Sequence, residues 1–383
     1  MTEFDNIRPF RDDEVEAVLI RMLADEDFIE FISSYRAPLL SRIFTRLVKH
    51  RVRAVLARET RHIDSIDKFQ HLVSDYVTRL INESSTSFEH QGVDRLEKQK
   101  GYLFISNHRD IAADSMLVDY ALYHSGYETV RIAIGDNLLQ RPFATDLMRL
   151  NKSFIIKRSA EGPKNIYAAL LQTSRYIVHS LDEAQSVWIA QREGRAKDGM
   201  DSTDPALIKM LTLSQRKYPG SYGELIESLN IVPVSISYEY DPCDMLKARE
   251  LYHIDKYGSY TKPSGEDLLS LVKGLNEFKG RVKLRIGEPL GSGFSSPEDV
   301  ATELDRQILG NYELYPPNYA ALSLIGEQPY QDIWQAHEQD YVSCFTAEEL
   351  HSFNQRLMQC PAEHQPYFLR MYANPLINLE SNR

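Results

Sequence analysis

A histidine stands just after a predicted strand, and two aspartates follow it closely. The segment Phe-Ile-Ser-Asn-His-Arg-Asp-Ile-Ala-Ala-Asp contains His108, Asp110 and Asp114. Histidine changes protonation near neutral pH and can act as a general base. A carboxylate on its second ring nitrogen would fix the tautomer and stabilise the imidazolium that forms. The segment therefore indicates a general-base pair, with a purely structural histidine as the competing interpretation.

Cations follow two further predicted strands. Lys157 and Arg158 end one strand, where an arginine can bind a phosphate through two parallel hydrogen bonds. The segment from Trp188 to Gly199 runs from a strand into a glycine-flanked loop with the sequence Gln-Arg-Glu-Gly-Arg-Ala-Lys-Asp-Gly. Its candidate anion-binding residues are Glu193, Gly194, Arg195 and Lys197. Such a loop can present backbone N–H groups and cations to an anion. The alternatives are a solvated strand end and an ordinary charged turn.

Short β-rich runs alternate with helical patterns through the middle of the chain, and this alternation is typical of an α/β fold. Strands are predicted over Tyr102–Ser106, Val130–Ile134, Ser153–Lys157, Val187–Gln191, Val232–Ser237 and Val282–Ile286. Helices are predicted between them, over Asp114–His124, Asn137–Arg149, Pro163–Ser180 and Gly265–Phe278. We therefore expect a largely parallel central sheet flanked by helices. Ligand sites in such sheets gather at the carboxyl ends of strands, which is where the three chemical segments lie.

The two ends of the chain have a helical pattern instead. Three regions are predicted: an N-terminal helical region at 1–87, an α/β domain at 88–310 and a mostly helical tail at 311–383. N-terminal helices are expected over Asp12–Leu23, Leu39–Leu56 and Ile66–Ile81, and a tail helix over Ala347–Cys360. The length of 383 residues suits one α/β domain of about 200 residues with additions.

Composition narrows the possible function classes. The formal net charge of −11 argues against a general nucleic-acid-binding protein. The three cysteines are far apart, so they predict neither a zinc site nor a disulfide framework, and they fit a reducing cytoplasm. No metal motif is present. No run of 18 apolar residues occurs, so we expect no transmembrane helix, and the polar start lacks the features of a signal peptide.

A basic segment interrupts this acidic chain near its start. Between positions 36 and 61 there are eight Lys or Arg residues and a single acid, Glu59. A basic amphipathic helix predicts contact with an anionic membrane surface, whereas a core-packed helix with solvated charges is the alternative. The candidate membrane-binding residues are Arg42, Arg46, Lys49 and Arg53.

Four segments, in this order, resemble the motifs of the glycerol-3-phosphate and lysophosphatidic acid acyltransferase superfamily, in a divergent bacterial-type branch. The corresponding residues are Asn107-His108…Asp114, Gly135…Phe143…Arg158, Glu193-Gly194-Arg195 and Val232-Pro233-Val234. The resemblance covers roughly residues 88 to 310. No G-x-S-x-G nucleophile elbow occurs, which fits a mechanism without an acyl-enzyme.

The resemblance implies an O-acyltransferase (a transferase of groups other than aminoacyl groups) in phospholipid biosynthesis. It implies that His108 takes the proton of an acceptor hydroxyl as that hydroxyl attacks acyl-CoA or acyl-ACP, and that Asp114 holds the histidine. Arg158, the Glu193–Arg195 segment and Lys197 would bind the glycerophosphate head group. The expected acceptor is 1-acyl-sn-glycerol 3-phosphate, and no tightly bound cofactor is expected. Lipid substrates and peripheral contact with the inner membrane face would be the partners, with acyl carrier protein as the other donor.

Two departures from the family motifs leave alternatives open. The family places four residues between its histidine and aspartate, whereas five stand here and the expected position holds Ala113. Asp110 is therefore a second candidate for orienting His108. The third motif is one residue short, so either Arg195 or Lys197 can perform the role of the family arginine.

The acceptor is also open. Glycerol 3-phosphate or another polar lipid is the alternative to the lysophospholipid. Two other classes of protein remain: a thioester or lipid hydrolase, and a catalytically inactive lipid-binding homologue. The sequence does not reveal acyl-chain length or oligomeric state.

Overall fold

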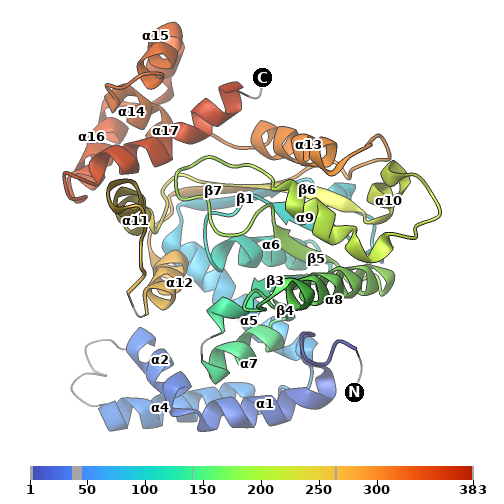
Figure 1. The fold of residues 1–383 in the computed structure, drawn as a ribbon. Coiled ribbons are helices and arrows are strands. Elements are labelled where there is room, and N and C mark those ends of the chain that lie inside the picture. Colours follow the sequence, from blue (N-terminus) through green and yellow to red (C-terminus); the bar gives the residue numbers. More distant parts are fainter. Residues whose placement is uncertain (1–2, 37–44, 140, 264, 382–383) are drawn as a thin grey trace. The chain divides into compact units, whose positions relative to one another are not determined.

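The computed structural model of the chain describes residues 3–36, 45–139, 141–263 and 265–381. These residues form two compact units, each built from segments that are separate in the sequence. Unit 1 consists of residues 1–77 and 130–177, and unit 2 consists of residues 78–129 and 178–383. Figure 1 gives the positions of the elements along the chain.

Unit 2 contains five strands in the order β1-β7-β6-β2-β5. The strands are β1 (Ser87–Gln91), β2 (Leu103–Ser106), β5 (Val187–Ala190), β6 (Ile231–Tyr238) and β7 (Arg281–Ile286). All the pairings are parallel except that of β6 with β7. Every residue of β2 and β6 is buried, so these two strands form the centre of the unit. The predicted α/β class with a largely parallel sheet is confirmed.

The edge strand β1 was not anticipated by the sequence, because its five residues, Ser-Phe-Glu-His-Gln, lack an apolar alternation. It is only partly buried and pairs with β7 alone. Gly92 ends it in the left-handed region (φ +89°), and a Cβ there would overlap the carbonyl oxygen of Ile286. Only glycine allows the chain to leave the sheet edge at this point.

Helices surround the strands of unit 2. Those between strands are α6 (Ala113–His124), α9 (Pro205–Leu211), α10 (Tyr222–Ser228), α11 (Asp244–Tyr257) and α12 (Glu266–Asn276), and α13 (Pro297–Gly310) follows β7. Short 3₁₀ turns lie at Val93–Arg95 and Leu213–Gln215. The start of α13 illustrates the local signals: Pro297 occupies its first position, and Ser296 and Asp299 cap each other's backbone N–H groups.

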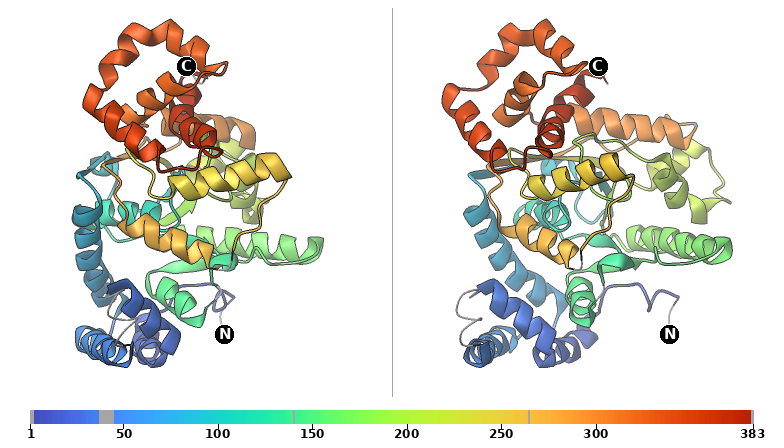
Figure 2. Two further views of the ribbon diagram at one scale, coloured as in Figure 1. Left: turned by 90° about the vertical axis from the view of Figure 1, so that its left-hand side faces the viewer. Right: turned by 60° about the vertical axis from the view of Figure 1, so that its left-hand side comes forward.

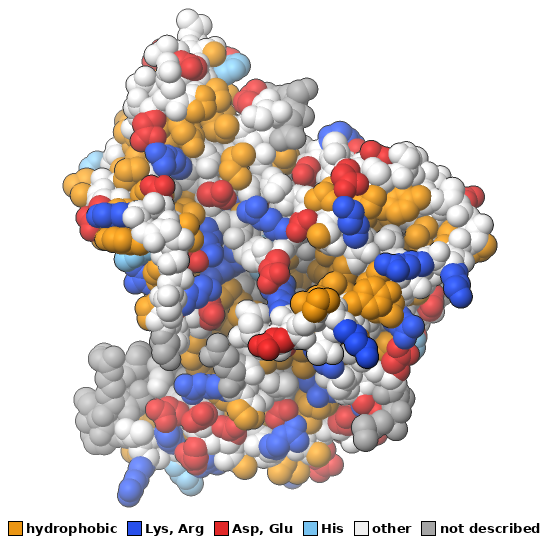
Figure 3. All heavy atoms as spheres, viewed as in Figure 1, with side chains coloured by type: hydrophobic (Ala, Val, Ile, Leu, Met, Phe, Trp, Pro, Cys, Tyr) orange, Lys and Arg blue, Asp and Glu red, His pale blue; other side chains and the backbone are white. Residues whose placement is uncertain are grey.

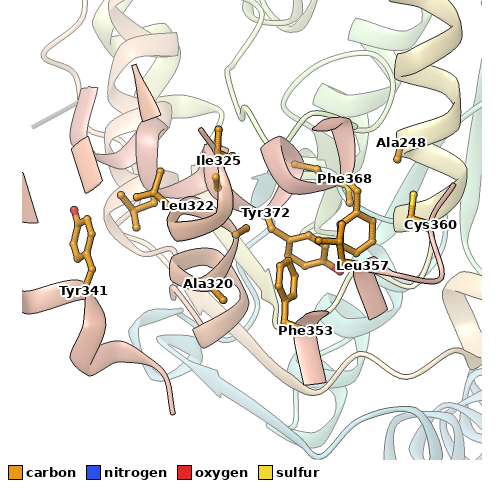
Figure 4. Close-up of a cluster of buried hydrophobic side chains, with 14 residues drawn as sticks. Ala248, Ala320, Leu322, Ile325, Tyr341, Phe353, Leu357, Cys360, Phe368 and Tyr372 are labelled. Atoms are coloured by element: carbon orange, nitrogen blue, oxygen red, sulfur yellow. The ribbon is translucent and has the colours of Figure 1, made fainter. Parts of the chain in front are cut away.

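The tail of unit 2 is a helical group with a core of its own, as predicted in outline. It comprises α14 (Pro316–Leu324), α15 (Tyr330–Tyr341), a 3₁₀ turn at Val342–Cys344, α16 (Ala347–Leu357) and α17 (Gln365–Ser381), which lie together in Figures 1 and 2. Figure 4 shows the core, where the rings of Phe353, Phe368 and Tyr372 pack with centroids 5.1–5.8 Å apart. Ala248 of α11 joins the same cluster, so the tail is packed against the α/β part of its unit.

Unit 1 combines the N-terminal helices with two parallel strands. Its elements are α1 (Asp12–Ala24), α2 (Glu26–Arg36), α4 (Thr45–Thr60), most of α5 (Ile66–Ser84), β3 (Arg131–Gly135), α7 (Pro142–Leu150), β4 (Ser153–Ile156) and most of α8 (Pro163–Asp182), with a 3₁₀ turn at Asp136–Leu138. Its apolar core joins α1 and α2 to Phe143 and Leu150 of α7. Arg42 and the start of the helix predicted over Leu39–Leu56 lie outside the described residues. Among the residues that are described, none of the helices is both long enough and apolar enough to cross a bilayer.

Candidate active site

The end of β2 is fixed to its neighbour by an asparagine. The side chain of Asn107 donates to the carbonyl oxygen of Ile236 (2.9 Å) and accepts from the backbone N–H of the same residue (2.8 Å). These bonds extend the β2–β6 pairing by one residue through a side chain. Asn107 is fully buried. The asparagine of the Asn-His motif therefore determines where the backbone of the following histidine leaves the sheet.

His108 and Asp114 meet directly. Nδ1 of His108 lies 2.8 Å from Oδ2 of Asp114. The aspartate is the second residue of α6 and is fully buried, whereas the histidine side chain keeps 16% of its surface exposed. No hydrogen-bond partner for Nε2 of His108 occurs among the described residues, so this nitrogen remains available to a substrate.

Asp114 is held from several sides in its ionised form. Its Oδ2 also accepts from the backbone N–H groups of Arg109 (2.7 Å) and Asp110 (3.0 Å), and its Oδ1 accepts from the Tyr238 hydroxyl (2.8 Å). Burial raises the pKa of this carboxyl, but the hydrogen bond and charge of His108 and the other donors outweigh burial and lower the pKa below its usual value. Tyr238 was not identified from the sequence; the only available signal was a hydroxyl at the end of the strand next to β2.

Asp110, the second candidate for orienting His108, has a different task. Its Oδ1 accepts from the backbone N–H groups of Ala112 (3.0 Å) and Ala113 (2.8 Å). These groups lie at the start of α6, where backbone N–H groups have no carbonyl partner within the helix. Burial and the nearby charge of Asp114 raise the pKa of the Asp110 carboxyl. The carboxylate that contacts His108 is therefore Asp114, and Asp110 caps the helix that carries it.

The loop between β5 and α9, residues 191–204, lies beside the histidine and is called the β5 loop. The backbone N–H of Ala196 donates to the carbonyl oxygen of His108 (2.8 Å). Trp188 of β5 donates from Nε1 to Oγ of Ser106 (3.1 Å), and its ring lies edge-on to the imidazole with centroids 5.8 Å apart. The first and third sequence segments are thus brought together by adjacent strands, β2 and β5.

The two candidate cations of this loop have different surroundings. Lys197 forms an ion pair with Glu250 of α11. Arg195 has a buried Nη1 without a hydrogen-bond partner among the described residues. Its positive charge acts against the burial that raises the pKa of the Asp110 carboxyl. Gly194 lies exposed in the left-handed region (φ +78°), next to the exposed Glu193. Because Lys197 is already neutralised, Arg195 is the loop cation with unused hydrogen-bonding capacity.

A buried ion pair next to the histidine was missed from the sequence. Arg109 donates from Nη2 to Oδ2 of Asp201 (2.6 Å) and to the carbonyl oxygen of Gly199 (3.1 Å). The backbone oxygen of Arg109 in turn accepts from Nζ of the fully buried Lys247 (2.6 Å). Burial opposes the charge of Arg109, but the Asp201 carboxylate keeps its pKa raised. Residues adjacent to His108 are thereby tied to the far end of the β5 loop.

Arg158 belongs to unit 1, whereas His108, Asp114 and the β5 loop belong to unit 2. Within unit 1 the backbone N–H of Arg158 donates to Oδ1 of Asp136 (3.0 Å), and Ser159 donates to the same carboxylate. The side chain of Arg158 is exposed. Within the parts of the chain that the structure describes, no group of three or more His, Cys, Asp or Glu residues could hold a metal ion.

Some cations of the basic helix α4 pair with acids of α2, and the others are exposed. Lys49 pairs with Glu30 (3.0 Å), and Arg53 pairs with Glu26 (2.6 Å) and donates to the carbonyl oxygen of Leu23. These two predicted membrane-binding residues therefore contact α1 and α2. The exposed basic residues of this segment are Arg46, Arg51, Arg58 and Arg61, and none of them forms an ion pair with another described residue.

Comparison with known proteins agrees with the motifs. Residues 87–236 match the family described as Acyltransferase. Over 243 residues the chain is 27% identical to a glycerol-3-phosphate acyltransferase of Baumannia cicadellinicola subsp. Homalodisca coagulata, covering 60% of this chain and 27% of that protein. A glycerol-3-phosphate acyltransferase of Pseudoalteromonas translucida is 27% identical over 214 residues, covering 55% of this chain and 24% of that protein. The aligned part thus spans about a quarter of these relatives' own length.

A solved structure is also similar. The crystal structure of the 1-acyl-sn-glycerophosphate acyltransferase PlsC from Thermotoga maritima matches with a TM-score of 0.37 and 15% sequence identity, over 75% of this chain and 92% of that one. The family match at residues 87–236 begins with β1 and ends in β6, and it includes His108, Asp114 and the β5 loop. This match and the curated relatives support an acyltransferase of the superfamily that includes the glycerol-3-phosphate acyltransferases, on the evidence of residues 87–236.

Proposed function

We propose that this chain transfers a fatty acyl group from a thioester donor to the hydroxyl of a glycerol phosphate. The observation that carries the proposal is the His108–Asp114 pair, in which Nδ1 is bound and Nε2 has no partner among the described residues. A buried carboxylate on one nitrogen leaves the other as the proton acceptor. The arrangement suits a general base that activates a hydroxyl.

The proposed reaction proceeds in two steps, attack on the thioester and release of the thiol. The acceptor oxygen attacks the thioester carbonyl carbon while its proton passes to Nε2 of His108, and a carbon–oxygen bond forms. The tetrahedral intermediate then collapses, the carbon–sulfur bond breaks, and the imidazolium returns the proton to the thiolate. The products are an ester and a free thiol. The ionised Asp114, whose pKa is held low, stabilises the imidazolium between the two steps.

The phosphate of the acceptor binds to the β5 loop in this proposal. Arg195 supplies a partly buried guanidinium whose buried Nη1 lacks a partner among the described residues, which is the state expected of an anion-binding group without its anion. Glu193, Gly194 and Lys197 shape the same loop, and Arg158 remains a candidate contact for the head group. Arginine suits a phosphate because it offers two parallel N–H donors.

Two acceptors fit this chemistry. The sequence motifs led to 1-acyl-sn-glycerol 3-phosphate, and the curated relatives are named for glycerol 3-phosphate. Both present a hydroxyl near a phosphate, so both are part of the proposal. Acyl-CoA and acyl-ACP are the proposed donors.

The test measures release of free thiol from palmitoyl-CoA with lysophosphatidic acid, with glycerol 3-phosphate or without an acceptor. His108→Ala is compared with His351→Ala, which removes an exposed histidine whose hydrogen-bond partner among the described residues is Gln355. Acceptor-dependent release that is lost in the first variant alone supports the proposal and identifies the acceptor. Release without any acceptor would indicate a hydrolase. Absence of turnover with both CoA and carrier-protein donors would indicate a lipid-binding homologue and overturn the proposal.

We also propose that the protein works at the inner face of a membrane as a peripheral protein. Support comes from the four exposed arginines of the α4 segment, since each cation near an anionic lipid surface contributes about 1 kcal/mol to binding. Figure 3 shows basic and acidic side chains intermixed on the face it displays.

A further inference from the structure

The tail helix α17 contacts the loop that carries the proposed anion-binding residues. Nδ2 of Asn374 donates to the carbonyl oxygen of Asp198 (2.7 Å), and Nδ2 of Asn378 donates to the carbonyl oxygen of Asp201 (2.7 Å). Both asparagines are buried. They lie four residues apart and therefore on the same face of the helix. One helix face thus holds both ends of the segment 198–201.

The loop is shaped to receive this helix. Gly199, between the two bonded carbonyl groups, is buried and has a φ of +84°. A Cβ at this position would overlap the carbonyl oxygen of Met371 on α17. The loop therefore lies directly against the helix backbone, and a side chain at this position would separate them.

The held segment leads directly to the proposed catalytic residues. Asp201 forms the ion pair with Arg109 (2.6 Å), which follows His108 in the sequence, and Arg109 also donates to the carbonyl oxygen of Gly199. On the other side of the loop, Ala196 donates to the carbonyl oxygen of His108 (2.8 Å). The helix, the loop and the histidine backbone are thus joined by a continuous series of hydrogen bonds.

A second face of α17 is anchored in the tail core. Phe368 and Tyr372 lie in the tail core with Phe353 (Figure 4). The hydroxyl of Tyr372 also donates to Asp244 of α11 (2.8 Å). A helix fixed on one face and bonded to a loop on another is able to hold that loop in one conformation. None of these tail residues belongs to the family match, which ends at residue 236.

We propose that α17 is part of the active site, with Asn374 and Asn378 as positioning residues. They hold the β5 loop so that Arg195 and the backbone around His108 keep one geometry. The inference rests on the proposed function for its effect on catalysis, but its structural half is measured without any substrate.

The first test is hydrogen exchange of the β5 loop in Asn374→Ala and Asn378→Ala. The control is Asn230→Ala, because Asn230 is partly buried and also donates to a backbone carbonyl group, that of Gly101 (3.1 Å), and neither residue belongs to α17 or to the loop. We expect peptides covering 192–201 to exchange at least about tenfold faster in the first two variants and at the wild-type rate in the control. Equal exchange in all the proteins would overturn the inference. Using single variants guards against loss of the fold.

The second test separates the substrates. In Asn374→Ala and Asn378→Ala, KM for the phosphate-bearing acceptor should rise about tenfold while KM for acyl-CoA stays within about twofold. Asn230→Ala should lower the unfolding temperature and leave both KM values unchanged. Faster exchange without a change in either KM would overturn the positioning role. If the wild type transfers no acyl group, the proposed function fails, and the exchange measurement still decides whether α17 holds the loop.

Discussion

At the scale of single residues, the spacing between His108 and Asp114 depends on where α6 begins. The helix starts at Ala113, so Asp114 lies in its first turn, at the positive end of the helix dipole, which favours a negative charge. The five intervening residues form the turn that Asp110 caps. The residue types were readable from the sequence, but the choice between the two aspartates depended on this helix start, which spacing alone does not determine.

The two aspartates make a matched pair of variants. Asp114→Asn removes the carboxylate that contacts His108, and kcat should fall about 10³- to 10⁴-fold, as expected when a histidine loses its carboxylate partner. Asp110→Asn retains an oxygen for the two backbone donors and removes a buried carboxyl whose pKa is raised, so kcat should fall less than about tenfold. Steady-state kinetics with unfolding temperatures compares them. A larger loss of kcat in Asp110→Asn than in Asp114→Asn would show that Asp110, and not Asp114, orients His108.

Lys279 provides a test of pH dependence. Burial lowers the pKa of its ammonium group to about 8 from 10.5, although it donates to Ser84 and two carbonyl oxygens. The folded state therefore binds fewer protons than the unfolded state between pH 8 and 10.5, and stability attributable to this residue rises with pH in that window. The free energy of unfolding of the wild type should gain up to about 3 kcal/mol relative to Lys279→Met. Denaturant titrations of both proteins at pH 7.5 and 10 measure this difference in the free energy of unfolding. An equal difference at the two pH values would contradict the prediction.

At the scale of elements, much of the sheet could be anticipated. The expected strands at 102–106 and 282–286 begin within one residue of β2 and β7, because continuous apolar runs indicate buried strands. The weakly apolar edge strand β1 gave no such signal. The role of α17 was also hidden, since its contacts with the β5 loop join residues about 175 positions apart and depend on tertiary packing. Patterns along a chain report burial, but they do not identify the partner.

Two glycines of the β5 loop test the packing of this element. Both have positive φ, so an alanine at either position costs about 1 kcal/mol or more of backbone strain. Gly194 has open space around it, whereas a Cβ on Gly199 would overlap the backbone of α17. Gly199→Ala should therefore reduce the free energy of unfolding by at least about 2 kcal/mol more than Gly194→Ala. Urea unfolding compares them, and equal losses would mean that the loop does not need to lie so close to the helix.

At the scale of the whole molecule, membrane attachment can be tested with two neutralised pairs on one helix. Arg51→Gln with Arg58→Gln removes two exposed cations, and binding to vesicles containing anionic lipid should weaken about thirtyfold. Lys49→Gln with Arg53→Gln removes two cations that already face acids of α2, and binding should weaken less than about threefold. Vesicle sedimentation at low and high salt measures both. Equal effects of the two pairs would show that attraction depends on net charge alone.

The pairing of β1 with β7 has a consequence for how this protein is made. Gln91 leaves the ribosome about 190 residues before Arg281, the first residue of the strand that β1 requires. At about 5–20 residues per second, β1 waits roughly 10–40 s during translation before its partner exists. Its polar composition, with a glutamate, a histidine and a glutamine in five residues, gives a lone strand little tendency to join another nascent chain. The weak strand signal that hid β1 in the sequence thus protects the nascent chain from aggregation until its sheet can be completed.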